Sequence, residues 1–303
     1  MVVYLLVSII STSSLFVLFK GFERFNINTL QAIVVNYWTA IAIGYLTTDS
    51  PLVFADSIDK AWFVHAAWLG LLFIVFFHLI AFASQRIGVA VTTTSNKMAV
   101  VIPIVVGVFF YGESAIWYKV LGILCALVAL YLITKPIEKS TVKKSFLILI
   151  LPVILFAGGG AMDVALNYVQ KDIIQGFYVG EQAELETAWF STSIFICAAV
   201  LGTLVVLFQL LKGKLKINLR SIVAGIILGI PNYTSIYFLL RAIDTKVLGA
   251  SALFPIANVG GILFATVASM IIFKEKLSRH NWFGVVLSVI GIFLIVLETM
   301  LNG

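Results

Sequence analysis

Lys97 is the residue whose type and position point most directly to chemistry. It lies inside an otherwise apolar run, Val89 to Tyr111, that is long enough to cross a bilayer. An ammonium near the bilayer centre costs about 2.5–3.5 kcal/mol on insertion scales, and chains usually carry that cost where the charge faces protein or a water-filled cavity. Lys97 therefore indicates an internal polar path through the membrane.

Other polar and aromatic residues lie at a similar depth. Asn96 falls on the same helix face as Lys97, and at 1.5 Å rise per residue Lys97 is only about 4–5 Å from the middle of its run. Asn232, Tyr233 and Asn258 lie within roughly 3 Å of the middle of their apolar runs, and Trp38 is also central in its run. The candidate substrate site therefore comprises Lys97, Asn96, Asn232, Tyr233, Asn258 and Trp38.

Each of these residues has a proposed role and an alternative. Lys97 would meet an anionic group of a ligand, such as a carboxylate, because an unpaired ammonium in low dielectric loses its proton. The asparagines would donate and accept hydrogen bonds, and Tyr233 and Trp38 would form apolar walls. The alternatives are that Lys97 pairs permanently with a protein carboxylate or snorkels, that the asparagines join helices at about 0.6–2 kcal/mol per bond, and that Trp38 only packs.

Two further residues are candidate proton carriers. A partly buried carboxyl such as Asp163 can shift toward a neutral pKa, and a histidine such as His78 starts close to one. The alternative for both is a hydrogen-bonded packing role. A direct ion pair between Asp163 and Lys97 is not expected, because Asp163 lies about 9 Å toward the opposite membrane face.

Composition places these residues in a membrane protein. The 303-residue chain is 61% hydrophobic and only 11% charged, with a mean hydropathy of +1.10. Soluble domains carry about 25% charged residues. The net charge of +6 lies mostly in short segments between apolar runs, so it does not indicate nucleic acid.

Motifs for covalent chemistry are absent from the sequence. It contains no Walker A run, no H-E-x-x-H, no G-x-S-x-G and no Cys/His cluster with metal-ligand spacing. Its two cysteines, Cys125 and Cys197, lie inside apolar runs and give no disulfide framework. We therefore expect a protein that is not an enzyme and that uses no metal or cofactor.

Apolar runs near the ~20 residues needed to cross a bilayer recur along the chain. None shows sustained period-2 alternation, so helices are expected and a barrel is not. The ten runs are Val2–Phe19, Thr29–Thr48, Ala61–Ala83, Val89–Tyr111, Ala115–Thr134, Ser145–Val169, Thr187–Leu211, Ser221–Leu240, Val247–Phe273 and Trp282–Thr299.

The charge distribution predicts an orientation. Most of the Lys and Arg residues lie in alternate joining segments, such as Lys135–Lys144 and Lys212–Arg220, while most of the acidic residues lie on the other side. The positively charged side is expected to be cytoplasmic, which places both termini outside. Tryptophans at the starts of runs fit an interfacial belt; they are Trp62, Trp117, Trp189 and Trp282.

A weak internal repeat divides the chain into 1–138 and 139–303. At one offset Asn96, Glu113 and Gly122 correspond to Asn258, Glu275 and Gly284. Five spans in each half is an odd number, so the second half must be inverted in the membrane. Inverted repeats of this kind place a substrate near the midplane between the halves.

The two halves carry a similar signature after their fourth span. It reads Tyr111-Gly112-Glu113 in the first half and Phe273-Lys274-Glu275-Lys276-Leu277, followed by Trp282-Phe283-Gly284, in the second. With ten spans in two halves, the chain resembles the drug/metabolite transporter superfamily, EamA type. The resemblance implies a secondary carrier that exports or exchanges small metabolites, often amino acids or related compounds. The motif glutamates are Glu113 and Glu275, and we expect each to be a structural partner of the next helix N-terminus.

The sequence thus predicts an all-α integral membrane protein with ten transmembrane helices in two inverted five-helix repeats. Its expected function is alternating-access transport of a small polar or zwitterionic metabolite across the cell membrane, with protons as a candidate coupling ion. Its expected partners are that metabolite and the lipid bilayer. The alternative is a passive channel or a lipid-handling scaffold, and a membrane enzyme is a third reading.

Overall fold

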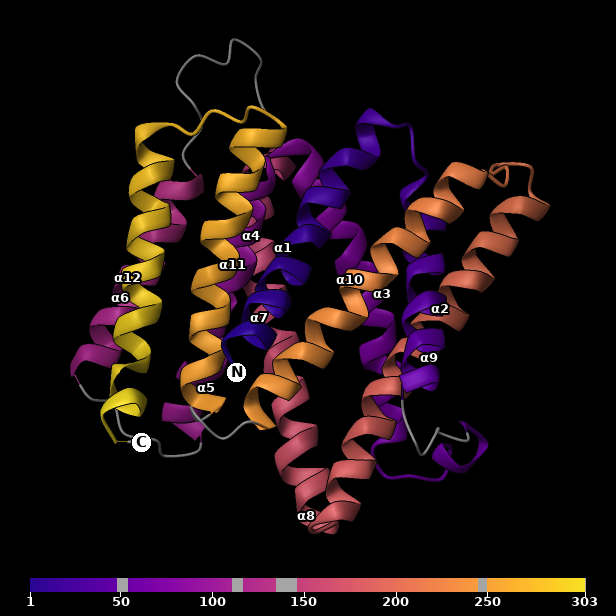
Figure 1. Ribbon diagram of the computed structural model, residues 1–303, viewed down its shortest axis with the longest axis horizontal. Coiled ribbons are helices and arrows are strands. Elements are labelled where there is room, and N and C mark those ends of the chain that lie inside the picture. The colour runs from indigo at the N-terminus through magenta and orange to yellow at the C-terminus, as the bar shows by residue number, and fades with distance from the viewer. Residues whose placement is uncertain (48–53, 111–116, 135–145, 245–249, 303) are drawn as a thin grey trace. The chain divides into compact units, whose positions relative to one another are not determined.

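The computed structural model describes residues 1–47, 54–110, 117–134, 146–244 and 250–302, and every regular element in these ranges is helical (Figure 1). The expected all-helical class is confirmed for them. The elements are α1 (Val2–Arg24), α2 (Thr29–Thr47), η1 (Phe54–Ser57), α3 (Phe63–Arg86), α4 (Val89–Lys97), η2 (Met98–Val100), α5 (Val101–Phe110), α6 (Trp117–Thr134), α7 (Phe146–Tyr168), η3 (Val169–Ile174), α8 (Gln175–Phe177), α9 (Glu181–Leu211), α10 (Leu219–Asp244), α11 (Ala250–Ile272) and α12 (Arg279–Asn302).

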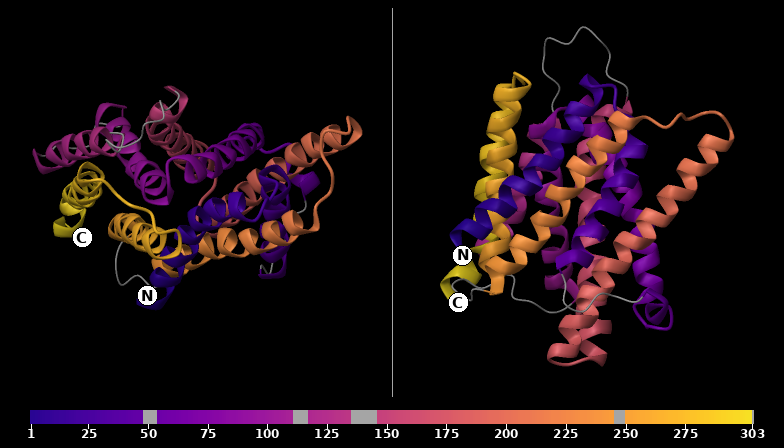
Figure 2. Two further views of the ribbon diagram at one scale, coloured as in Figure 1. Left: turned by 90° about the horizontal axis from the view of Figure 1, so that it is seen from above. Right: turned by 45° about the vertical axis from the view of Figure 1, so that its right-hand side comes forward.

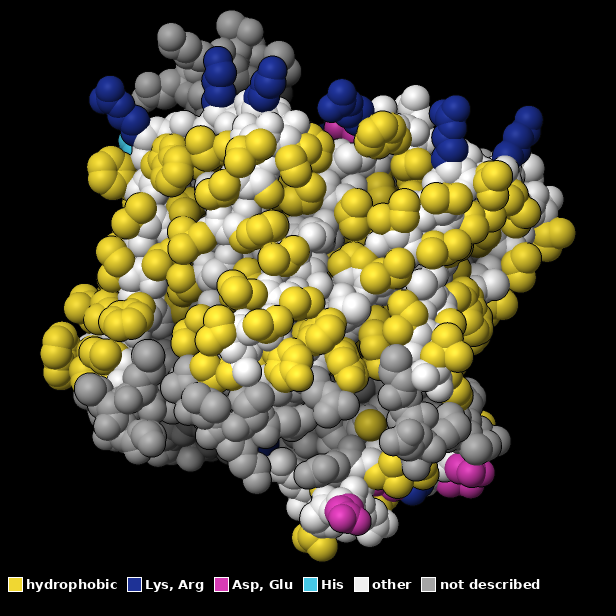
Figure 3. Space-filling model, viewed as in Figure 1, with side chains coloured by type: hydrophobic (Ala, Val, Ile, Leu, Met, Phe, Trp, Pro, Cys, Tyr) yellow, Lys and Arg dark blue, Asp and Glu magenta, His cyan; other side chains and the backbone are white. Residues whose placement is uncertain are grey.

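Seven helical segments within the described residues are long and apolar enough to cross a membrane. Three shorter apolar segments lie at Trp117–Ile133, Ile256–Ile272 and Arg279–Leu294. Hydrophobic side chains cover the sides of the helices, and Lys and Arg side chains lie at helix ends (Figure 3). The chain is therefore a multi-pass membrane protein, while the count of ten spans stays a prediction.

The helix that carries Lys97 changes from α-helical to 3₁₀ geometry directly after it. The run that begins at Val89 forms α4, then the 3₁₀ segment η2, then α5. Pro103 explains this change, because proline has no N–H and its ring crowds the carbonyl four residues earlier, here that of Ala99. A 3₁₀ stretch within a helix often marks a hinge.

The sixth and seventh expected spans have different bounds in the structure. α7 continues through the π-helical segment η3 into α8, and α9 begins at Glu181, not at Thr187. Glu and Ala favour helix, and acidic side chains in the first turn complement the helix dipole. The acidic start of α9 is therefore helical although it is too polar to have been counted with the apolar run. Gly158, Gly159 and Gly160 lie in an unbroken part of α7.

The helices group into two compact units, each made from segments of both sequence halves. Unit 1 comprises Met1–Gly21, Ile80–Ala161 and Thr234–Gly303, and unit 2 comprises Phe22–Leu79 and Met162–Tyr233. The division of the chain into repeats at 1–138 and 139–303 stays a prediction.

In unit 1, α6 and α12 lie side by side through small residues (Figures 1 and 2). A Cβ added at Gly291 would lie 3.0 Å from the carbonyl oxygen of Gly122, and one at Gly284 would lie 2.6 Å from Ile133. Asn281 adds a hydrogen bond of 3.0 Å from its Nδ2 to the Ile133 carbonyl. At Gly291 and Gly122 no side chain separates the two backbones, and at Gly284 the Ile133 side chain fills the space of the missing Cβ, so the helices approach closely, as small residues permit in membrane helices.

In unit 2, α10 packs on α2 through two glycines four residues apart. A Cβ at Gly225 would lie 2.6 Å from the carbonyl oxygen of Ala32, and one at Gly229 would lie 2.8 Å from that of Asn36. Both neighbours are backbone atoms, which cannot rotate away as a side chain would. The small-xxx-small spacing therefore sets the distance between these two helices.

Gly225→Ala is expected to lower the melting temperature of the detergent-solubilised protein. Overpacking a tight contact costs about 1–3 kcal/mol. The matched control is Gly21→Ala, because Gly21 is also helical but has no atom within 4 Å of an added Cβ. That variant should keep or raise the melting temperature, since alanine is the better helix former. Equal melting temperatures for the two variants would contradict the close α2–α10 contact.

Candidate functional site

Lys97 is the last residue of α4, where the helix gives way to η2. A Cβ added at Gly261 of α11 would lie 3.4 Å from Lys97 Cε, and Ser13 Oγ of α1 donates a hydrogen bond of 3.2 Å to the Gly261 carbonyl. The half-buried Lys97 side chain therefore lies against a glycine of α11, close to a hydroxyl of α1.

Two of the predicted asparagines belong to the same unit as Lys97. Asn96 precedes it in α4, and Asn258 lies three residues before Gly261, so Asn258 and Gly261 share one face of α11. Both asparagines are half-buried. Unit 1 thus places Lys97 against the helix that carries Asn258, which the sequence could not establish.

The other three predicted site residues belong to unit 2. Asn232 is buried, and the ring of Tyr233 lies 3.3 Å from the Cβ position of Gly44. Trp38 is 45% exposed and donates a hydrogen bond of 3.0 Å from Nε1 to Thr203 Oγ1 of α9. Both roles that the sequence left open for Trp38, a wall of the site and plain packing, stay predictions.

The two proton-carrier candidates are also in unit 2 and differ in environment. Asp163 is exposed near the end of α7. His78 is half-buried in α3, and its Nδ1 lies 2.8 Å from the Ile74 carbonyl. A carbonyl accepts only from a protonated nitrogen, so Nδ1 carries the proton and Nε2 keeps a lone pair in the neutral ring.

The signature glutamate Glu275 lies at a helix N-terminus, but not at that of the next helix. Its two carboxylate oxygens each lie 3.1 Å from the backbone N–H of Val89, the first residue of α4. Lys20 Nζ lies 4.0 Å from Glu275 Oε1 and donates a hydrogen bond of 2.8 Å to the Gln85 carbonyl. The expectation that Glu275 would meet α12 is therefore corrected, and Glu113 lies outside the described residues.

The start of α12 explains this difference, because it is already capped. Ser278 N donates to Asn281 Oδ1 at 3.2 Å, and Asn281 N donates to Ser278 Oγ at 3.1 Å. Reciprocal bonds of this type satisfy the free N–H groups at a helix start. The carboxylate of Glu275 is thus available to α4, whose N-cap residue Gly88 has no side chain and a φ of 95°.

Glu275→Ala is expected to lower the melting temperature, because it removes the acceptor at the start of α4 and the partner of Lys20. Loss of a helix cap costs about 0.5–2 kcal/mol. Glu181→Ala is the matched control: Glu181 is an exposed residue in the first turn of α9. A change no larger for Glu275→Ala than for the control would contradict the capping role.

A second ion pair, in unit 2, was not expected from the sequence. Glu186 is only 2% exposed; its Oε1 accepts from Lys60 Nζ at 2.5 Å and its Oε2 accepts from Trp62 Nε1 at 2.7 Å. The hydrogen bond with Glu186 raises the pKa of Lys60 above its usual value. We call Lys60, Trp62 and Glu186 the acidic-end cluster.

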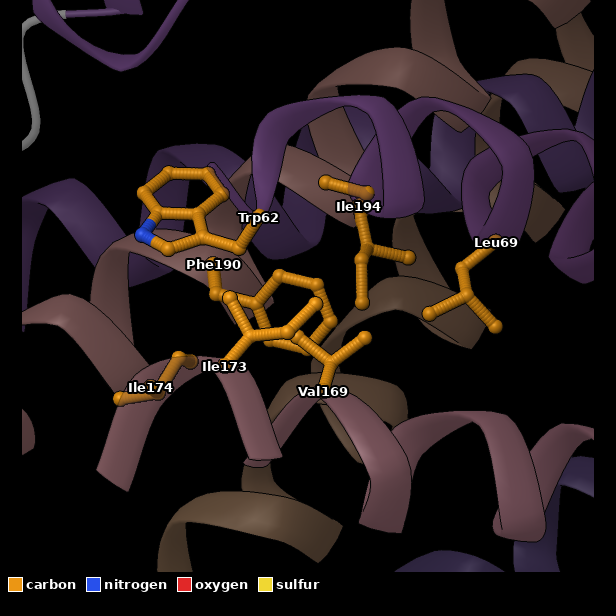
Figure 4. Packing of buried hydrophobic residues seen from close by; sticks show 8 residues of the cluster. Trp62, Leu69, Val169, Ile173, Ile174, Phe190 and Ile194 are labelled. Carbon is orange, nitrogen blue, oxygen red and sulfur yellow. The ribbon is translucent and has the colours of Figure 1, made fainter. Parts of the chain in front are cut away.

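Aromatic rings complete the surroundings of Lys60. Its Nζ lies 5.5 Å from the ring centroid of Tyr178 and 5.6 Å from that of Trp189, within cation–π range. Trp62 packs edge-on against Phe190, in a hydrophobic cluster that Figure 4 shows. Trp62 is fully buried and is not part of an exposed belt, unlike Trp117, which is 71% exposed.

No group of three His, Cys, Asp or Glu side chains that could hold a metal is found among the residues that the structure describes. In unit 1 the lysine, two asparagines and a serine hydroxyl lie on apolar helices of membrane-spanning length or close to it. Such groups can bind and orient a polar solute.

Comparisons with known proteins add a relative and a fold. No protein-family model matches the chain. An uncharacterized protein of Haemophilus influenzae is 26% identical over 295 residues, which cover 95% of this chain and 96% of that protein. A crystal structure matches with a TM-score of 0.52 and 13% identity over 98% of this chain and 99% of its own. At that identity the likeness concerns the fold alone, and it extends along the whole chain.

Proposed function

We propose that this chain is a secondary transporter of the cell membrane, with ten spans in two inverted five-helix repeats of the EamA type. The observation that carries the proposal is the position of Lys97. A membrane-depth ammonium lies where α-helical geometry changes to 3₁₀, beside the Asn258 face of α11. Intramembrane charges of this kind commonly mark substrate pathways.

The proposed substrate is a small polar or zwitterionic metabolite, related to amino acids, whose anionic group binds the Lys97 ammonium. Asn96 and Asn258 supply hydrogen bonds to it from the same unit. The 3₁₀ segment η2 supplies the hinge by which the second part of that span, α5, moves relative to α4. Such a hinge suits a carrier that alternates between two openings.

The proposed orientation places both termini outside the cytoplasm, with the basic segment Lys212–Arg220 inside. Asp163 and His78 are the proposed proton carriers that would couple the cycle to a gradient. No step makes or breaks a covalent bond, so the proposal requires neither an enzymatic group nor a cofactor. Export or exchange is proposed over import on the resemblance to the EamA type.

The test is exchange in liposomes. Purified protein is reconstituted into vesicles loaded with a metabolite extract, and mass spectrometry follows which compounds leave when the same extract is outside. Exchange of one compound class, absent from protein-free vesicles, is expected. Folded protein that exchanges no compound would contradict transport and favour a lipid-handling scaffold. A compound altered in mass would instead indicate an enzyme.

A further inference from the structure

The buried face of α2 carries polar side chains close to mid-membrane. Residues 33, 36, 37 and 40 fall on one side of the helix by spacing. Asn36 and Tyr37 are each 0% exposed, as is Ile33, and Ala40 is 1% exposed. At 1.5 Å rise per residue, Asn36 lies about 3 Å from the middle of α2.

The Asn36 carboxamide has no hydrogen-bond partner among the residues that the structure describes. This holds for both Nδ2 and Oδ1, and the Oη of the neighbouring Tyr37 likewise has none in the described ranges. A buried polar group without a partner costs folding free energy, and within a membrane little water is at hand to relieve it. Unsatisfied buried groups in folded proteins call for an explanation, and function is a common one.

Helix packing does not explain Asn36. At this level α10 contacts the Thr39 side chain and the Asn36 backbone: a Cβ at Gly229 would lie 2.5 Å from Thr39 Cβ and 2.8 Å from the Asn36 carbonyl oxygen. The side-chain amide contributes no bond to it. Tyr37, by contrast, packs its ring against Phe77 of α3 and Phe195 of α9, at 5.5 and 6.1 Å between centroids.

Asn281 shows what a structural buried asparagine looks like in this chain. It is 4% exposed, its Nδ2 donates to the Ile133 carbonyl at 3.0 Å, and its Oδ1 accepts from Ser278 Oγ at 2.6 Å. The nitrogen of that amide joins α12 to α6, and its oxygen binds the residue just before α12. The two buried asparagines thus differ in whether the side-chain amide has hydrogen-bond partners among the described residues.

We infer that the Asn36 carboxamide binds the zwitterionic head of an α-amino-acid-like substrate. Its Oδ1 would accept a hydrogen bond from the ammonium and its Nδ2 would donate one to the carboxylate, so one planar amide matches both charged groups. Hydrogen bonds to charged groups are stronger than neutral ones. The inference rests on the proposed transport function and names a substrate-binding residue for it.

The full burial of Asn36 assigns this binding to a more open conformation than the one described. Exposure of the amide gives it a partner, water or substrate, that it lacks among the described residues. The unsatisfied amide therefore favours opening, and substrate binding replaces the missing hydrogen bonds. A ligand shifts such an equilibrium only by its different affinity for the two forms, and this amide supplies such a difference.

The test compares Asn36→Leu with Asn281→Leu, using a mixture of the twenty common amino acids as the probe. Melting temperature is measured with and without the mixture for both variants and the wild-type protein. Without the mixture, Asn36→Leu should keep or raise the melting temperature, because it removes an unpaired polar group. Asn281→Leu should lower it, because it leaves the Ile133 carbonyl and Ser278 without a partner.

At the concentration that half-saturates the wild-type protein, the mixture should raise the melting temperature of the wild-type protein and of Asn281→Leu, and should raise that of Asn36→Leu far less. Half-saturation for Asn36→Leu should rise about 10- to 100-fold, as expected for losing bonds to charged groups. A lower melting temperature for Asn36→Leu without ligand, or equal ligand stabilisation in all three proteins, would overturn the inference. So would a wild-type protein that no amino acid stabilises.

These outcomes are separate from those of the proposed function. Stabilisation by amino acids without exchange in vesicles would contradict transport and leave Asn36 as a binding residue. Exchange in vesicles with unchanged half-saturation in Asn36→Leu would leave transport standing and overturn the role of Asn36.

Discussion

Lys97→Ala is expected to reduce exchange in vesicles about 10- to 100-fold. The ammonium is proposed to bind the anionic group of the substrate, and a hydrogen bond to a charged group contributes about 1.5–3 kcal/mol, while each 1.4 kcal/mol is a factor of ten in affinity. The half-saturation concentration of the exchanged compound, measured by mass spectrometry, gives this change. A charge at membrane depth costs insertion free energy. A residue that only packs would not need a charge, so the presence of Lys97 supports a binding role.

Lys97→Met separates charge from shape, because methionine keeps most of the side-chain length that lies against Gly261. It should lose exchange as fully as Lys97→Ala. Lys214→Ala, in the exposed segment between α9 and α10, is the control for loss of a positive charge and should exchange at the wild-type rate. Normal exchange by Lys97→Met would assign Lys97 to packing and remove it from the substrate path.

Lys60→Met is expected to lower the free energy of unfolding by about 3–5 kcal/mol, the usual cost of leaving one partner of a buried ion pair alone. The carboxylate of Glu186 is 2% exposed and, among the residues that the structure describes, would keep only Trp62 as a partner. Glu186→Leu should be similarly destabilising. The double variant should be more stable than the sum of the two predicts, because replacing a whole buried pair by apolar groups is often close to neutral.

The pH dependence of this effect follows from Lys60. Folding raises its pKa through the hydrogen bond with Glu186. The stabilisation is therefore fully present below the ordinary lysine value of about 10.4 and is lost as pH rises through the raised, folded-state value. Melting temperatures of the wild-type protein and Lys60→Met should differ most near neutral pH and converge only in strong alkali.

A matched control for this cluster is Lys212→Met. Lys212 is exposed beyond the end of α9, and its Nζ lies 4.1 Å from the ring centroid of Phe208 without an ion-pair partner among the contacts described. It should leave the melting temperature almost unchanged. If Lys60→Met also left the melting temperature almost unchanged, Lys60 and Glu186 would not form a stabilising pair in the folded protein.

Much of the helical pattern could be predicted from hydropathy, and the exceptions have local causes. Within the described residues the expected runs coincide with helix except at the run ends Ala61, Trp62 and Phe273, because long apolar segments satisfy their backbone groups best as helices. The change of geometry after Lys97 depends on Pro103, whose presence is visible in the sequence but whose effect as a 3₁₀ segment is not. The acidic start of α9 is helical although it is too polar to read as a span.

The partners of the ionisable residues could not be predicted, because they are set by tertiary contacts. Glu275 and the start of α4 are far apart in the sequence, so no sequence pattern predicts their contact. The sequence instead favours α12, which follows Glu275 directly. Glu186 reads as a loop carboxylate, and its burial depends on Lys60 and Trp62 approaching from the chain before α3. Among the residues three or four positions from Asn36, Thr39 is polar but none is ionisable, so the spacing does not mark Asn36 as a binding residue.

The most direct measurement of alternating access is trans-acceleration. Vesicles containing the protein are loaded with the exchanged compound in isotope-labelled form, and its efflux is timed with and without the unlabelled compound outside. The binding site of a carrier returns across the membrane faster when it holds substrate, so external compound should accelerate efflux. Lys97→Ala should lose this acceleration. Efflux that proceeds at the same rate whether or not the compound is outside would contradict a carrier and indicate a passive channel.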